Sequence, residues 1–198
     1  MGIVSQPSRD EAWELVREWV SSESLRKHML GVEAARRAYA AKFGEDEETW
    51  GIAGLVHDFD YERFPDLSDT VNGHPRTALR MLAEMGYPKD VIDAVAGHAT
   101  FLGVPRETKM AKTLFAVDEL TGFIGACAMV RPTGIEGMKP KSVAKKLKQP
   151  SFAAGVDRDE VRLGAEELGV EFGEHVAFVI EALAGHADEL GLGPREES

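Results

Sequence analysis

The sequence lacks a long apolar run, has little cysteine and has fewer basic than acidic residues, and each shortage argues against a class of protein. No apolar stretch approaches the roughly 18 residues that a membrane-spanning helix needs, so we expect no membrane segment. The single cysteine, Cys127, cannot build a disulfide framework. The N-terminal residues lack the basic-then-apolar order of a signal peptide, so we expect a reducing cytoplasm. The net charge of −11 argues against duplex nucleic acid as a partner.

Apolar residues are nevertheless frequent enough to form one core, since 43% of the 198 residues are hydrophobic. They recur at helical spacing, and no segment shows the alternation typical of a strand. The sequence therefore predicts an all-α fold, a compact single-domain helical bundle over residues 1–198. The predicted helices run over about 9–20, 23–42, 47–58, 75–85, 88–99, 107–130, 157–168 and 172–190.

Local signals mark several of these helix ends. Ser8 followed by Glu11 is a capping-box pattern, and Asp157 with Glu160 is another capping signature. Gly44 is expected to end the second helix, because glycine readily takes the left-handed conformation there. Between residues 131 and 148 the chain turns basic, and we expect a loop there, followed by the C-terminal helices up to about residue 190.

The most informative stretch is WGIAGLVHDFD, residues 50–60, in which an apolar segment ends with His57 and Asp58 side by side. Groups that can ionise are costly to bury unless each finds a partner. A divalent metal suits an imidazole and a carboxylate at once. A His-Asp pair also arises by chance, so a metal site requires further groups elsewhere in the chain.

Four further groups lie at helix ends or on core-facing stripes. Asp118 falls inside an apolar stripe, where a carboxylate must be protonated, paired or bound to metal. His28 and His98 border apolar faces and could equally be boundary histidines, while His74 precedes a proline and could merely cap a helix. The two remaining histidines, at positions 175 and 186, are predicted to be surface or boundary residues.

The ordered set resembles the HD-domain metal-dependent phosphohydrolases, in which a His, a His-Asp pair, one or two intervening His and a final Asp lie on helices. The resemblance covers about residues 22–130 and rests on His28 and the fragments VHDFD (56–60), NGHP (72–75), GHA (97–99) and VDELTG (117–122). It implies a helical fold of the HD type with a metal site. Residues 131–190 lie outside the resemblance.

The resemblance also implies a ligand set. A first metal would be held by His28, His57, Asp58 and Asp118, and a second by Asp58, His74 and His98, with Asp58 bridging; members without the intervening histidines hold one metal. Iron, manganese, cobalt, nickel and zinc all tolerate such a mixed set, whereas Mg²⁺ prefers oxygen ligands. No thiolate-rich zinc site is expected, because there is no second cysteine.

The activity implied is metal-dependent hydrolysis of a phosphate monoester or diester, with a nucleotide or another small phosphate ester as substrate. Asp58 would be essential, and Asp60 and Glu62 would orient water or protonate the leaving oxygen unless they are only solvated loop carboxylates. Dinucleoside-polyphosphate hydrolases of bacteria share the layout and provide one substrate possibility. A di-iron oxygenase, as in myo-inositol oxygenase, and a non-catalytic metal or nucleotide sensor are the alternatives.

The basic segment 131–148 offers a further hypothesis about the substrate. Lys139, Lys141 and Lys145 could screen phosphate charge if this segment folds over the metals as a lid, or they could form a solvated helix face. The negative net charge of the whole chain would repel a polyanion. We therefore expect a small phosphorylated molecule rather than a polymer as the partner.

Overall fold

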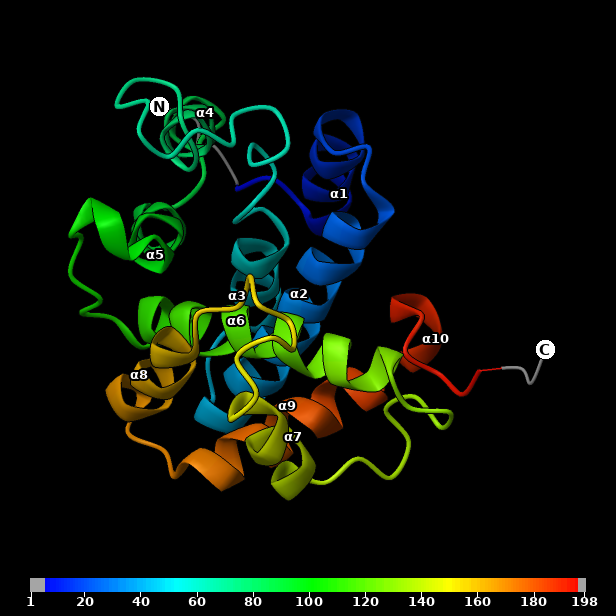
Figure 1. Cartoon of the computed structure of the whole chain (residues 1–198). Coiled ribbons are helices and arrows are strands. Elements are labelled where there is room, and N and C mark those ends of the chain that lie inside the picture. The colour runs from blue at the N-terminus through cyan, green and yellow to red at the C-terminus, as the bar shows by residue number, and fades with distance from the viewer. Residues whose placement is uncertain (1–5, 196–198) are drawn as a thin grey trace.

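The structure, a computed structural model, describes residues 6–195, and every regular element in that range is helical (Figure 1). The all-α prediction is therefore confirmed. The elements are α1 (Arg9–Trp19), α2 (Glu23–Phe43), α3 (Glu47–Leu55), α4 (Arg76–Glu84), α5 (Lys89–His98), a 3-10 turn (Thr100–Leu102), α6 (Lys109–Met129), α7 (Pro140–Leu147), α8 (Arg158–Leu168), α9 (Phe172–Ala184) and α10 (Ala187–Leu190). Within residues 6–195 no helix combines the length and apolar character that a membrane crossing requires.

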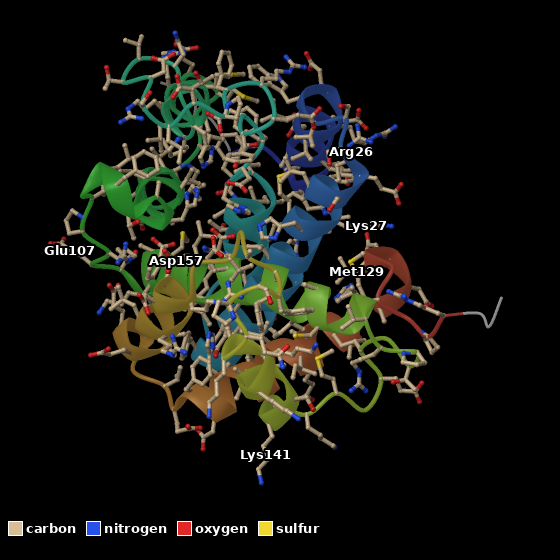
Figure 2. All side chains as sticks on the ribbon, viewed as in Figure 1. Arg26, Lys27, Glu107, Met129, Lys141 and Asp157 are labelled. Atoms are coloured by element: carbon tan, nitrogen blue, oxygen red, sulfur yellow. The ribbon has the colours of Figure 1, made fainter. Side chains whose placement is uncertain are left out.

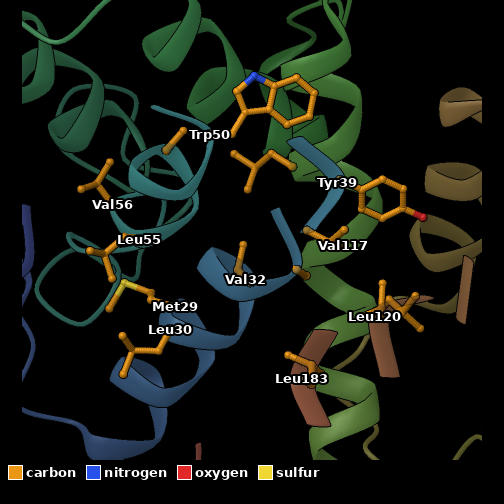
Figure 3. Packing of buried hydrophobic residues seen from close by; sticks show 14 of the residues in the cluster. Met29, Leu30, Val32, Tyr39, Trp50, Leu55, Val56, Val117, Leu120 and Leu183 are labelled. Atoms are coloured by element: carbon orange, nitrogen blue, oxygen red, sulfur yellow. The ribbon is translucent and has the colours of Figure 1, made fainter. Parts of the chain in front are cut away.

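The core lies where α2, α3, α6 and α9 pack together (Figure 3). Val32 of α2, Leu55 of α3, Leu120 of α6 and Leu183 of α9 are all fully buried. Each such side chain stabilises the fold by about 1.5–3 kcal/mol relative to an exposed one. The two long central helices, α2 and α6, thereby become a rigid support for the side chains that they carry.

The local capping signals act as predicted. The Ser8 hydroxyl accepts a hydrogen bond from the Glu11 N–H, and the Glu11 carboxylate accepts one from the Ser8 N–H at 2.8 Å. Gly44 ends α2 in the left-handed conformation, with φ of 70°. Asp157 caps α8 by accepting from the N–H groups of Asp159 and Glu160. These predictions succeeded because each signal is contained within four residues of sequence.

Three predicted elements differ from the structure. The third helix ends at Leu55 rather than near residue 58, because His57 turns its ring back to bond the Gly54 carbonyl and the chain enters a series of turns. The last helix is interrupted at Gly185, a poor helix former, and α10 starts anew at Ala187. Part of the basic segment is a helix, α7, with Pro140 in its first turn.

The prediction for His175 is wrong, whereas that for His186 is confirmed. His186 is exposed, but His175 is only 1% exposed and bridges distant helices. Its Nε2–H donates to the Ala116 carbonyl at 2.9 Å, and its Nδ1 accepts from the Tyr39 hydroxyl at 2.6 Å. Burial lowers the pKa of His175, so the ring is neutral and structural. Cys127 is buried and free, as expected.

Candidate metal centre

Six side chains from separate parts of the chain converge beside the interior of α2 and α6. They come from three kinds of position, namely the interior of a helix, a turn and a helix end. They are His28 on α2, His57 and Asp58 in the turn after α3, His74 before α4, His98 at the end of α5, and Asp118 on α6. The structure thus brings together all six residues that the sequence singled out.

Asp58 lies at the middle of this cluster, and its two oxygens face different partners. Its Oδ2 lies 3.4 Å from Nε2 of His57 and 3.9 Å from Nε2 of His28. Its Oδ1 lies 3.3 Å from Nε2 of His74 and 3.4 Å from Nε2 of His98. Two sets of potential ligands, His28-His57-Asp58 and Asp58-His74-His98, therefore share this one carboxylate.

Asp118 completes the first of the two sets. Its Oδ1 lies 3.0 Å from Nε2 of His28 and 3.3 Å from Nε2 of His57. The position of Asp118 follows from α6, whose apolar stripe is buried against α2 and so directs this carboxylate inward. The same two imidazole nitrogens therefore lie within 3.9 Å of one oxygen from each aspartate.

Three of the imidazole rings are held with Nε2 toward the cluster. Nδ1 of His57 donates to the Gly54 carbonyl at 2.7 Å, and Nδ1 of His98 donates to the Val95 carbonyl. Nδ1 of His74 donates to the Asp60 carboxylate at 2.7 Å. With Nδ1 as the donor, Nε2 of each neutral ring keeps its lone pair for a cation. A hydrogen bond of this kind is what fixes the ring of a metal-binding histidine.

The free lone pairs have too few partners within the protein. The buried Nε2 of His57 has no hydrogen-bond partner among residues 6–195. Nε2 of His74 and Nε2 of His98 lie 3.1 Å apart, so two acceptors face each other. A cation between the imidazoles and the carboxylates would satisfy all of these atoms, and the donor set fits a divalent transition metal.

The charges of the cluster also suit a cation. Burial alone would raise the pKa of Asp58, but the imidazoles around it, His57 foremost, outweigh burial and hold that pKa well below its usual range. The same balance between burial and the imidazoles of His57 and His28 lowers the pKa of Asp118. In return, the two carboxylates raise the pKa of His57 despite its burial. A divalent ion would take the place of the proton that these carboxylates draw onto His57.

Asp60 and Glu62 do not lie where a reacting group would meet them, which corrects the expectation of a catalytic role. Asp60 is fully buried, and both of its oxygens are occupied, one by His74 Nδ1 and the other by the Ala78 N–H at 2.8 Å. It therefore positions the His74 ring and is not a solvated loop carboxylate. Glu62 is exposed and accepts from the N–H groups of Ser21 and Ser22, at the junction of α1 and α2.

The basic segment is also not placed as a lid over the cluster. Lys139, Lys141 and Lys145 are exposed, and α7 packs against α9 and α6. Figure 2 shows Lys141 extending from α7 into solvent, away from the rest of the molecule. Of the described residues that line the cavity at the cluster, none is Lys or Arg. The solvated helix face is the interpretation that the structure favours.

A cavity of about 510 Å³ opens onto the cluster. One side is formed by Tyr61 and Phe101, whose rings are partly exposed, and another by Gly155 and Val156 from the segment before α8. The carboxylate ligands thus face a space large enough for a small molecule.

Glu119 lines the same cavity and was not singled out in the sequence. Its carboxylate accepts from the Asp157 N–H at 2.9 Å. Burial, reinforced by the charge of Asp118, raises the pKa of Glu119 to about 7. The only sequence signal was its place in VDELTG directly after Asp118. Helical geometry turns adjacent residues about 100° apart, so the apolar stripe did not include it.

Comparison with known proteins gives one match. The model of the HD domain family matches residues 25–122, a range that begins in α2, ends in α6 and contains all six clustered residues. No curated protein and no solved structure matches the chain significantly.

Proposed function

Because the chain belongs to the HD-domain superfamily, we propose that it is a metal-dependent phosphohydrolase acting on a nucleotide or another small phosphate ester. The observation that carries the proposal is the place of Asp58, whose two oxygens each face their own group of imidazole nitrogens. A carboxylate shared in this way is suited to bridge two cations a few ångströms apart, which is the arrangement that phosphoryl transfer uses in two-metal sites.

In the proposed enzyme, His28, His57, Asp58 and Asp118 hold one divalent ion, and Asp58, His74 and His98 hold a second. Iron, manganese, cobalt, nickel and zinc all suit this donor set. When bound, such ions lower the pKa of a water molecule towards neutrality and neutralise charge on phosphoryl oxygens.

The protein's own groups hold the site ready for this chemistry. Asp58 and Asp118 stay ionised, and the hydrogen bonds at Nδ1 keep three imidazole rings in one tautomer and one orientation. Asp60 acts one step further out, by fixing His74. Since the described lining contains no Lys or Arg, the proposal assigns neutralisation of the phosphoryl group to the metals alone.

The test is a panel of phosphate esters assayed after metal removal with EDTA and addition of Mn²⁺, Co²⁺, Ni²⁺, Zn²⁺, Fe²⁺ or Mg²⁺ in turn. We expect phosphate release with at least one transition metal and its loss in Asp58→Ala. Asp10→Ala, an exposed aspartate on α1, is the matched control and should keep full activity. Phosphate release that survives Asp58→Ala would contradict the site.

Binding and oxygen-uptake assays on the same metal-loaded protein separate the two alternatives. Metal and nucleotide binding without any phosphate release would indicate a sensor. Turnover of an alcohol that consumes oxygen and requires iron would indicate an oxygenase. Either result would overturn the hydrolase proposal while leaving the metal site in place.

A further inference from the structure

A second cavity, of about 490 Å³, adjoins the cluster on the other side of His28. It lies between α2, α6, α9 and α10 and is called here the α10 groove. His28 and Gly122 line both this groove and the cavity at the cluster, so the two spaces share a wall that includes a proposed metal ligand. In Figure 2, Lys27 of α2 and Met129 of α6 lie beside α10, at the groove.

The walls of the α10 groove are largely apolar. Leu183 of α9, Leu190 of α10 and Leu192, which follows α10, form one side of the groove, and Met129 lies at the end of α6. Among the described lining residues the charged side chains are Glu23 and Lys27, which pair with each other on the first turns of α2. The groove therefore offers apolar contact and no net charge, which suits an uncharged organic group.

Small residues on α2 and α6 keep this groove open. A methyl group added at Gly125 would meet no atom within 4 Å, so the space beside this helical position is empty. One added at Gly31 would lie 2.9 Å from Thr121 Cγ2, so glycine is needed there for the helices to approach.

Thr121 adds little polarity to the wall of the groove. It lines the groove and is 5% exposed, and its hydroxyl has no hydrogen-bond partner among the residues that the structure describes. Because this hydroxyl is itself enclosed, the groove stays apolar at this point.

The charges at the cluster limit how many phosphoryl groups a bound substrate can carry. Two divalent ions, offset by Asp58 and Asp118, would leave about two positive charges, enough for one phosphoryl dianion. The cavity adds Glu119 and Glu160 and, in its described lining, no cationic side chain. Additional phosphoryl groups would meet carboxylates rather than Lys or Arg.

We propose that the α10 groove binds the organic part of the substrate, and that the substrate is a phosphate monoester with one phosphoryl group and a largely apolar, uncharged alcohol. This inference rests on the proposed function above. The phosphoryl group lies at the cluster and the alcohol extends past His28 and Gly122 towards Gly125 and Leu190.

The test fills the groove from Gly125. Gly125→Phe places a ring in empty space, and its first side-chain carbon meets no other atom. The matched control is Ala41→Phe, at an exposed position of α2, a helix as long as α6. The esters are 1-naphthyl phosphate and methyl phosphate, assayed with the most activating metal. Comparing the ratio of their kcat/KM values between variants cancels the difference between the two leaving groups.

We expect Gly125→Phe to lower the naphthyl-to-methyl ratio at least about tenfold, which corresponds to about 1.4 kcal/mol, and Ala41→Phe to leave it as in the wild type. A second readout is binding of 1-naphthol, followed by its fluorescence, to the metal-free protein in EDTA. Its Kd should rise at least about tenfold in Gly125→Phe. Circular dichroism verifies folding, and Gly125→Leu replaces the Phe variant if that one melts early.

The outcomes separate this inference from the proposed function. If the wild type hydrolyses both esters but ratio and Kd stay within about twofold in the Gly125 variant, the groove assignment is overturned and the hydrolase stands. If the wild type hydrolyses neither ester, the function proposal fails for these compounds, and the 1-naphthol titration alone decides the groove.

Discussion

Asp60→Asn is the substitution that tests most sharply how the site is built. The carboxylate is fully buried, and its two oxygens accept from His74 Nδ1 at 2.7 Å and from the Ala78 N–H at 2.8 Å. An asparagine has the same shape but only one oxygen. If that oxygen faces His74, the amide N–H groups oppose the Ala78 N–H. If it faces Ala78, the His74 ring must move its proton to Nε2 and can no longer offer that atom to a metal.

Either arrangement leaves one buried donor unsatisfied, which costs about 1–3 kcal/mol of the free energy of unfolding. Loosening a group that orients a metal-binding histidine also lowers metal affinity about 10–100-fold. Urea denaturation in EDTA measures the first effect, and metal titration of the folded protein measures the second. Asp66→Asn, at an exposed turn, is the control and should change stability by less than about 0.5 kcal/mol. An Asp60→Asn protein with wild-type stability and wild-type metal affinity would refute this role.

Further predictions concern pH, metal number and substrate binding. Glu119→Gln should gain about 1–2 kcal/mol of stability over wild type between pH 4.5 and pH 8, measured by urea unfolding in EDTA. The pKa of Glu119 in the folded protein, about 7, lies above its unfolded value, so the wild type loses stability as pH rises through this window. The full pKa shift would correspond to about 3.4 kcal/mol, and partial exposure of the side chain reduces this value. His74→Ala should retain one bound ion per chain by elemental analysis, while the exposed His186→Ala retains both; equal ion content in the two would contradict the second set of ligands. Lys141→Ala should change KM for phosphate esters less than about twofold, because its side chain is solvated; a large rise in KM would restore the lid hypothesis.

The helical fold could be predicted because its signals are local, and the six clustered residues because their order along the chain resembles a known family. Ser8 with Glu11 and Gly44 mark helix ends through contacts within a few residues. Asp118 interrupts an apolar stripe, a conflict that is visible in the sequence alone. The order of the histidines and aspartates then indicated the family, and the family model matches the same range.

The predictions that failed depend on contacts across the chain. His175 is buried because its partners, Tyr39 and the Ala116 carbonyl, lie on α2 and α6, and nothing near residue 175 reveals them. Asp60 lies among turn-forming residues, for which the sequence predicts a loop carboxylate, yet the N–H of Ala78 on α4 binds and encloses it. Lys141 shows that a run of basic residues predicts an exposed surface but not whether that surface faces the metal cluster or the solvent.

The central claim is that Asp58 joins two metal sites. Its most direct test is the number of divalent ions bound per chain by the wild type and by Asp58→Ala, measured by equilibrium dialysis with Mn²⁺, Co²⁺, Ni²⁺ and Zn²⁺ followed by elemental analysis. We predict about two ions in the wild type and loss of both in the variant, because each set of ligands loses its shared oxygen. A variant that keeps the full number of ions, or a wild type that binds none of these metals, would contradict the account.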